Sequence, residues 1–223
     1  MLAETRRRSA WGLAVAVICL SIFVIGLWEP LWDGIDSHFP TRHEVRNGAQ
    51  PTTWDVRSTV GPGQSRAVRE ALGVLPPAYQ RLVQQHEGKL LVTNRAALAR
   101  LSPLASNHLT YTAGLYVPAT KQVYVAYDSS NSGRTALHEM GHLVDHALSY
   151  PSRKPQFQAI FAAVEADNRL GSYPRSHPQE LFAELFAKYY FSDRQRAHVT
   201  AWFPQAASYF RVLEGKIVTD YGG

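Results

Sequence analysis

Apolar residues recur at helical spacing in six stretches of the chain that follow residue 65. The first stretch carries Val68, Leu72 and Leu75, and the second begins at Pro77, because proline is a favourable first residue of a helix. Four further helices are predicted at roughly residues 132–150, 156–168, 178–191 and 204–213. A stripe of apolar residues on one side of each helix indicates that these helices cover a common core.

Two segments predict β-strands instead of helices. Residues 89–93 (KLLVT) form a short apolar run of the length of a buried strand. Residues 109–127 carry β-branched and aromatic residues on both sides of a turn at residues 118–121. The second segment therefore predicts a β-hairpin, which lies directly before the helix expected at residues 132–150.

An apolar segment near the N-terminus, residues 11–28, predicts a transmembrane signal anchor. It holds eighteen residues without a charge, and a helix of about 27 Å, at roughly 1.5 Å per residue, approaches the hydrocarbon thickness of a bilayer. Arg6, Arg7 and Arg8 precede it and favour a cytoplasmic N-terminus. We therefore expect a single-pass protein of the cell membrane that contacts the lipid bilayer through residues 11–28 and is otherwise extracellular.

A cleaved signal peptide is the alternative interpretation, and it leaves a soluble secreted protein. Signal peptides usually have an apolar region of about 7–15 residues that is followed by small residues. Here residues 29–32 (EPLW) follow the segment, so a retained anchor is favoured. Residues 1–28 are thus assigned to a cytoplasmic basic tip and the anchor, residues 29–64, rich in proline and glycine, to a stalk or extended arm, and residues 65–223 to a folded domain.

The composition excludes several classes of protein. The chain is 45% hydrophobic and 18% charged, which is too apolar for an intrinsically disordered protein. Its net charge of +5 is small, and no nucleic-acid partner is expected because such proteins carry a much stronger basic stripe. Cys19 is the single cysteine, which excludes an intramolecular disulfide and cysteine-rich zinc sites.

The helix predicted at residues 132–150 contains the pattern HExxH, formed by His138, Glu139 and His142. Residues four apart lie on one face of a helix, so the two imidazoles can bind one zinc ion at about 2.0–2.1 Å. Glu139 points to a neighbouring face, where it can act as a base toward a zinc-bound water and return the proton to the leaving amine. This pattern predicts a hydrolytic zinc site.

A catalytic zinc site needs a third protein ligand. A third histidine ten positions after His138 is the metzincin arrangement, but that position is Leu148. Glu180 and Glu184 instead lie one turn apart on the helix predicted at residues 178–191, whose apolar side can pack against the HExxH helix. We therefore predict Glu180 as the third zinc ligand and Glu184 as a residue that holds a ligand histidine in place.

These motifs together resemble the catalytic domain of anthrax lethal factor and the related secreted Pro-Pro endopeptidases. In that family an HExxH helix is followed by a tyrosine and, seven residues later, by a glutamate that opens an ExFAE run. This chain has HEMGH, then Tyr173, then ELFAE from Glu180. Residues 113–116 (AGLY) and 123–125 (VYV) are similar to the strand pair that precedes the zinc helix in Pro-Pro endopeptidases. The resemblance extends over roughly residues 65–215.

The resemblance implies an α+β, zincin-like metalloprotease domain with a small mixed sheet, the HExxH helix and a helical C-terminal lobe. It implies one catalytic Zn²⁺ ion bound by His138, His142 and Glu180, with Glu139 as the catalytic base. Tyr173 is then expected to donate its hydroxyl to the oxyanion of the transition state.

Two further expectations concern the surroundings of the zinc site. Asp145, one turn after His142, is expected either to support a ligand histidine or to be an ordinary surface carboxylate. The strand at residues 123–127 is expected to form the edge of the sheet beside the cleft, where it could pair with the backbone of an extended substrate.

The sequence thus predicts a membrane-anchored extracellular zinc-dependent endopeptidase of the HExxH-plus-Glu, or gluzincin, type. Its expected partner is a protein or peptide substrate in extended conformation, hydrolysed by zinc-bound water. The alternative is a catalytically inactive, zinc-bearing surface module that binds extended peptides. Glu139 argues against this alternative, because binding alone requires no base.

Overall fold

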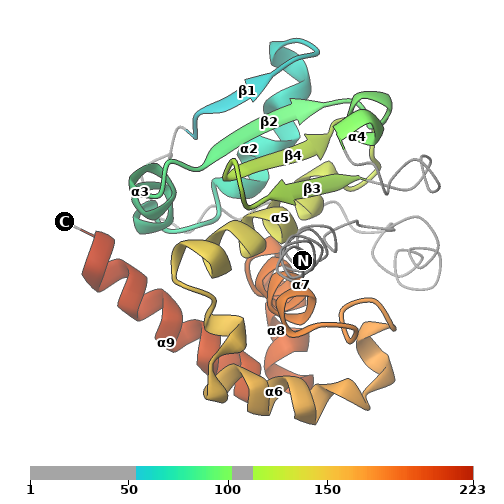
Figure 1. Ribbon diagram of the computed structural model, residues 1–223. Helices are drawn as coiled ribbons and strands as arrows, with labels where there is room; N and C mark the ends of the chain where they lie inside the picture. The colour runs from blue at the N-terminus through green and yellow to red at the C-terminus, as the bar shows by residue number, and fades with distance from the viewer. Residues whose placement is uncertain (1–53, 102–112, 223) are drawn as a thin grey trace, which may run out of the picture.

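The computed structural model describes residues 54–101 and 113–222 of the chain (Figure 1). The expected signal anchor and residues 29–53 of the expected stalk or extended arm lie outside these ranges and stay predictions. The boundary predicted at residue 64 is wrong, because Trp54 is buried in the core and Val56–Ser58 form a strand of the sheet. Among the described residues, no helix combines the length and the apolar character needed to cross a membrane. The described residues form a small sheet, a central helix packed against it, and a lobe of helices on the far side of that helix.

Four short strands form one mixed sheet in the order β1-β2-β4-β3. Their bounds are β1 Val56–Ser58, β2 Lys89–Thr93, β3 Gly114–Val117 and β4 Gln122–Ala126. β1, β2 and β4 run parallel, whereas β3 is antiparallel to β4 and joined to it by the turn at residues 118–121. The predicted strand at residues 89–93, the hairpin and the small mixed sheet are therefore confirmed.

The prediction that residues 123–127 form the edge of the sheet is wrong. β4 is paired on both sides, antiparallel to β3 and parallel to β2, where Val123 is the partner of Leu90. The pairing with β2 joins segments that are distant in the sequence, and local spacing does not report such a contact. Among the described strands, β3 forms the edge on this side of the sheet.

The central helix α5 (Ser132–Ala147) packs against β3 and β4 and separates the sheet from the helical lobe (Figure 1). It begins where the sequence predicts but ends before residue 150. Ser149 and Tyr150 both have a φ of 59°, in the left-handed region, and the 3-10 turn η3 (Pro151–Arg153) follows. The chain therefore leaves the helical conformation before Pro151 forces it to do so.

Three short helices accompany the strands of the sheet. They are α2 Arg66–Leu72, preceded by the 3-10 turn η1 Pro62–Ser65, α3 Pro77–Gln85 and α4 Arg95–Leu101. Pro77 begins α3 as predicted, whereas α2 ends before Leu75. α4 was not predicted, because only Leu98 and Ala99 of its residues are buried and a single turn of apolar residues gives no clear periodicity.

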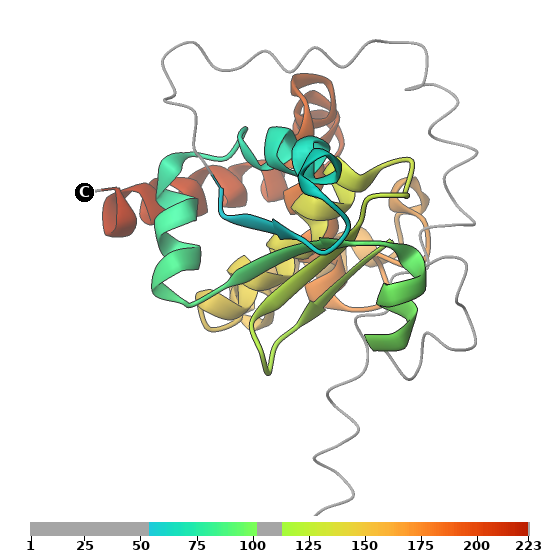
Figure 2. The ribbon, with the colours of Figure 1, turned by 90° about the horizontal axis from the view of Figure 1, so that it is seen from above.

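The C-terminal lobe consists of four helices and one 3-10 turn. These are α6 Pro155–Glu165, η4 Asn168–Leu170, α7 Pro178–Phe191, α8 Asp193–Trp202 and α9 Pro204–Tyr221. α7 has the predicted bounds, α9 is longer than predicted, and the largely polar α8 was not predicted. Both views place the end of α9 beside α3, where Nε of Arg81 donates to the carbonyl of Tyr221 (Figures 1 and 2).

Helix α7 is held in the middle of this lobe by aromatic packing. The rings of Phe182 and Phe186 are fully buried, and Phe182 contacts both Phe157 of α6 and Phe210 of α9 with ring centroids 5.2 Å apart. The opposite side of α7 faces α5, with which it makes the most extensive contact between any two described elements. α7 therefore has a fixed position from which its carboxylates reach α5, and the α+β class with a helical C-terminal lobe is confirmed.

Candidate active site

The two histidines of the HExxH motif lie side by side on α5. Their Nε2 atoms are 3.2 Å apart, and both residues are buried, with exposed fractions of 1% for His138 and 6% for His142. The spacing of four residues places both rings on the side of α5 that faces α7. Two nitrogen donors thus converge on one point in the interior.

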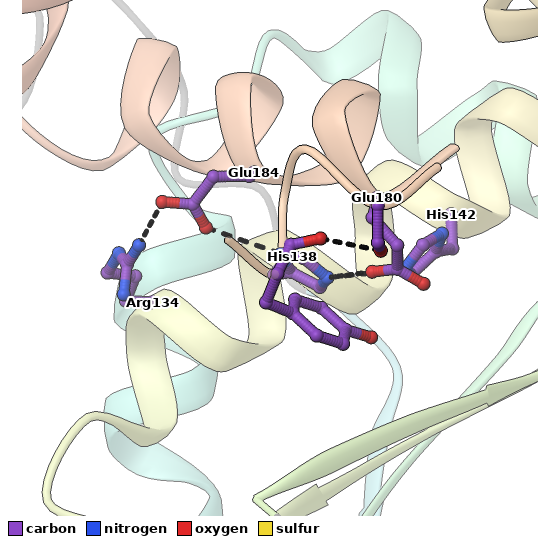
Figure 3. A network of polar contacts seen from close by, with 7 residues as sticks. Arg134, His138, His142, Glu180 and Glu184 are labelled. Carbon is purple, nitrogen blue, oxygen red and sulfur yellow. Dashed lines mark hydrogen bonds and ion pairs between the residues drawn. The ribbon is translucent and has the colours of Figure 1, made fainter. Parts of the chain in front are cut away.

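Glu180 reaches the same point from α7. Pro178 is the first residue of that helix, so Glu180 belongs to its first turn. Its Oε2 atom is 3.4 Å from Nε2 of His138 and 3.4 Å from Nε2 of His142 (Figure 3). Burial alone raises the pKa of this carboxyl, but the adjacent His142 and His138 outweigh that effect and hold the pKa well below its usual range.

The three donor atoms fit a tetrahedral zinc ion. Metal–ligand distances of about 2.0–2.2 Å at a tetrahedral angle place two ligand atoms about 3.4 Å apart. The three distances between the donor atoms of His138, His142 and Glu180 are 3.2, 3.4 and 3.4 Å. Among the described residues, these three form the group whose potential ligand atoms all lie within 4.8 Å of one another, close enough to hold one metal ion. The set of two imidazoles and one carboxylate suits Zn²⁺.

Glu184, one turn after Glu180, lies between Arg134 and His138 (Figure 3) and is also close to Lys188. Its Oε1 atom accepts from Nη2 of Arg134 and lies 3.4 Å from Nζ of Lys188, while its Oε2 atom is 3.6 Å from Nδ1 of His138. Burial acts to raise the pKa of Glu184, but Arg134 and Lys188 outweigh it and hold the pKa well below the usual range. The carboxylate is therefore charged and lies beside the ring nitrogen that faces away from the donor triangle.

Asp145 makes a different set of contacts from Glu184. The backbone N–H of Ser152 donates to its Oδ1 at 2.8 Å, and the hydroxyl of Ser152 donates to its Oδ2 at 2.6 Å. Both carboxylate oxygens are thus used to fix η3 against the end of α5. Of the two expected roles, a surface carboxylate does not describe this buried residue, and support of a ligand histidine stays a prediction.

Glu139 is buried between α5 and β3, with 1% of its surface exposed. Burial raises the pKa of its carboxyl to about 7, although His138, His142 and the backbone amide of Tyr116 act in the opposite direction. Among the described residues, its two oxygens have no side-chain hydrogen-bond partner. The carboxylate is therefore close to the donor triangle and able to exchange a proton near neutral pH.

Tyr173 lies in the loop between η4 and α7, and this loop is held by hydrogen bonds. The hydroxyl of Ser176 donates to the carbonyl of Tyr173 at 2.7 Å, and Nη1 of Arg175 donates to the carbonyl of Glu165 at 2.8 Å. Burial, together with the charges of Glu180 and Glu139, raises the pKa of the Tyr173 hydroxyl far above its usual value. The loop thus presents a protonated hydroxyl to the carboxylates of the site.

Seven site residues were predicted from the sequence, and Asp145, which binds Ser152, is the one that lies apart from the others. The structure brings together the other six, which are His138, Glu139, His142, Tyr173, Glu180 and Glu184. Arg134 was missed, although it lies four residues before His138 and an extension of the same helical row would have found it. Gly114 of β3, which contacts Glu139, was also missed, because no local pattern places a strand against that side chain. The roles of the site residues stay predictions.

Comparisons with known proteins agree with this geometry. The family model for anthrax toxin lethal factor, N- and C-terminal domain, matches residues 104–213. A Pro-Pro endopeptidase of Clostridioides difficile (strain 630) is 30% identical over 100 residues, which cover 43% of this chain and 46% of the relative. The chain therefore aligns with about half the length of that curated relative.

The fold has a close match among solved structures. The structure of the Pro-Pro endopeptidase PPEP-2 from Paenibacillus alvei superposes with a TM-score of 0.59 over 71% of this chain and 96% of that chain, at 21% identity. At this identity the match concerns the fold, and it confirms the zincin-like class. The three findings together confirm the predicted resemblance: residues 104–213 are similar to the anthrax lethal factor family, and the chain is similar to Pro-Pro endopeptidases in sequence and in fold.

Proposed function

We propose that this chain is a zinc-dependent endopeptidase that cleaves peptide bonds in extended segments of protein. The observation that carries the proposal is the triangle of donor atoms from His138, His142 and Glu180, with sides of 3.2–3.4 Å. Glu139 lies beside the triangle and is buried. A zinc site without hydrolytic function has no need of a buried carboxylate at this position, because such a group is costly to desolvate.

His138, His142 and Glu180 would hold a zinc ion, which would supply a Lewis acid to the scissile carbonyl and to a water molecule in the site. Glu139 takes the proton from the attacking water and delivers it to the nitrogen of the leaving amine. A pKa near 7 suits both steps, since the same carboxyl must accept and then donate a proton. Tyr173 remains protonated and donates its hydroxyl to the oxygen that gains negative charge.

The edge strand β3 is suited to binding a peptide substrate in extended conformation. Within the part of the chain that the structure describes, β3 is paired only with β4, so its other side offers backbone N–H and C=O groups to a peptide. Glu139 lies against the first residue of this strand, Gly114, which places the base next to a peptide bound along β3. Since related proteins are Pro-Pro endopeptidases, we include a preference for prolines at the scissile bond in the proposal.

The proposed location is the outer side of the cell membrane. Residues 11–28 are long and apolar enough to span a bilayer, and the three arginines at positions 6–8 favour a cytoplasmic N-terminus. The N-terminal mass of the protein isolated from membranes distinguishes an intact anchor from cleavage near residue 30. If the mass shows that the mature protein begins after residue 28, the proposed anchor is rejected.

Cleavage of a peptide library tests the proposed activity. The full chain, purified in detergent and loaded with one equivalent of zinc, is incubated with peptides that contain and lack consecutive prolines, and new termini are identified by mass spectrometry. We expect cuts that disappear in the E139A variant and after removal of zinc with a chelator. E139A is expected to lower the rate by roughly 10²–10⁴-fold while it keeps the metal.

A folded, zinc-loaded protein that binds peptides without cutting any of them would support the alternative of a peptide-binding module. The E180A variant then examines the site itself, because loss of one of three ligands must abolish tight zinc binding. If E180A still binds zinc tightly, both the proposed zinc site and the proposed activity are contradicted.

A further inference from the structure

We propose that Gly114 is a positioning residue for Glu139: the absence of a side chain at this point of β3 is what allows the catalytic carboxylate to stay beside the metal site. The proposal rests on the function proposed above, because it assigns Gly114 a role through the base. The three atoms nearest to a Cβ built on Gly114 belong to Glu139 and Thr135, and none of them belongs to a predicted metal ligand or to Tyr173.

The space around Gly114 is filled by two side chains of α5. A Cβ added to Gly114 lies 2.6 Å from Oε1 of Glu139, 2.7 Å from Cγ of Glu139 and 2.6 Å from Cγ2 of Thr135. All three distances are far below ordinary van der Waals contact, so no residue other than glycine fits without a shift of its neighbours. The side chain that a substitution introduces therefore points at the base.

The conformation of the backbone does not require a glycine here. The glycines with positive φ among the described residues are Gly61 and Gly171, whereas Gly114 has the backbone of an ordinary strand residue and pairs with Val125 of β4. Glycine is therefore required at this position only because there is no room for a side chain. It differs in this respect from the glycines of turns, which are needed for their freedom of φ.

The strand cannot move away to make room for a side chain. The N–H of Ala126 donates to the carbonyl of Ala113 at 2.8 Å, immediately before Gly114. Two residues further along β3, the hydroxyl of Tyr116 is 2.6 Å from Nδ1 of His146 on α5. β3 is thus tied to β4 on one side and to α5 below, on a buried face of the sheet.

Of the two neighbouring side chains, Glu139 and Thr135, that of Glu139 can move more easily. Its carboxylate is the end of a side chain with three rotatable bonds, whereas Thr135 is β-branched, buried and stiff at χ1. An added methyl group at Gly114 therefore displaces the carboxylate of Glu139 while α5 and its two histidines stay in place. Displacement of a catalytic group by about 1 Å costs on the order of 10²-fold in rate.

The test compares the G114A variant with a matched control, G215A. Gly215 lies in α9, and a Cβ there meets nothing within 4 Å. In the full zinc-loaded chain, G114A is expected to lower kcat by roughly 100-fold with little change in KM, because the new methyl group points toward α5 and away from the free side of β3. Zinc content and the affinity for zinc are expected to equal those of G215A.

A second substitution examines whether the effect passes through this contact. T135S removes the methyl group that lies 2.6 Å from the added Cβ, so the double variant G114A/T135S is expected to regain part of the lost kcat. T135S alone serves as the reference for the double variant.

A crystal structure of zinc-loaded G114A gives a readout that does not depend on activity. The proposal requires that the Glu139 carboxylate moves from its wild-type position while the three metal ligands do not. An unmoved carboxylate, or a kcat equal to that of G215A, overturns the proposal. So does a loss of zinc together with activity. If the wild-type protein cleaves no peptide, the proposed function fails, and the crystal structures still decide the positioning role.

Discussion

Gly141 of α5 lies directly against the backbone of Ala183 of α7: a Cβ on Gly141 falls 2.8 Å from the Cα of Ala183. Gly141 stands between the two histidines in the HExxH motif, and Ala183 stands between Glu180 and Glu184. The contact therefore sets how closely the helix that carries the carboxylates approaches the helix that carries the imidazoles. Glycine, which costs about 1 kcal/mol against alanine within a helix, is retained because this approach requires it.

The G141A variant is expected to push the two helices apart and to weaken zinc binding by roughly tenfold or more, since the carboxylate of Glu180 moves away from both rings. The overpacking is expected to lower the free energy of unfolding by about 1–3 kcal/mol, and the higher helix propensity of alanine offsets about 1 kcal/mol of this loss. A competition assay with a chelator measures the affinity for zinc, and thermal unfolding of the metal-free protein measures stability.

G215A is the matched control for this prediction as well. Because a Cβ on Gly215 meets nothing within 4 Å, alanine there is expected to raise stability slightly and to leave zinc binding unchanged. If G141A binds zinc as tightly as G215A does, the close contact with Ala183 is not what positions Glu180.

Zinc uptake is expected to depend on pH. In the metal-free protein, burial acts to lower the pKa of His142, but the charges of Glu180 and Glu139 outweigh it and raise the pKa to about 9. Below pH 9 the ring therefore carries a proton, which zinc must displace in order to bind. The apparent affinity falls as the pH falls, by about tenfold per unit for one displaced proton.

Calorimetric titrations in buffers of different ionisation enthalpy measure this proton directly. About one proton is expected to be released for each zinc ion bound at pH 7 to 8. An affinity that is constant between pH 8 and pH 7, with no proton released, contradicts the assignment of His142 as a ligand that is protonated in the metal-free state.

Glu184 and Asp145 are expected to respond differently to loss of charge. E184Q weakens the contact with Nδ1 of His138 and leaves Arg134 and Lys188 without their carboxylate, so zinc affinity is expected to fall by about 10–100-fold. D145N disturbs the hydrogen bonds to Ser152 and is expected to cost about 1–3 kcal/mol of stability with zinc affinity unchanged. The reverse pattern would show that Asp145 is the residue that supports a ligand.

The parts of the site that the sequence predicts are those that follow from helix geometry. His138 and His142 share a face because they are four residues apart, and Glu180 stands out because it opens a second amphipathic helix. The contacts that the sequence does not predict depend on the loops and on the sheet. Ser152 reaches Asp145 because the chain reverses through two residues with positive φ after α5.

The sheet illustrates the same limit. The hairpin of β3 and β4 is local and was predicted, whereas the parallel pairing of β2 with β4 joins distant segments and decides which strand is the edge. The position of Gly114 over Glu139 depends on that edge and has no local signal. Helices α4 and α8 were missed because few of their residues are apolar and buried, so their stability comes from packing on neighbours more than from their own pattern.

Tyr173 is expected to act on the rate of the chemical step and not on substrate binding. Its hydroxyl is kept protonated by burial and by the nearby carboxylates, and the loop that carries it is fixed by Ser176 and Arg175. Y173F removes one preorganised donor to the oxyanion and is expected to lower kcat by about 10²–10³-fold, with KM and zinc content unchanged. Y124F is the matched control, because the hydroxyl of Tyr124 is bonded to Gln122 within β4. A Y173F variant that keeps the kcat of Y124F excludes the oxyanion role and leaves Tyr173 as a packing residue of the loop.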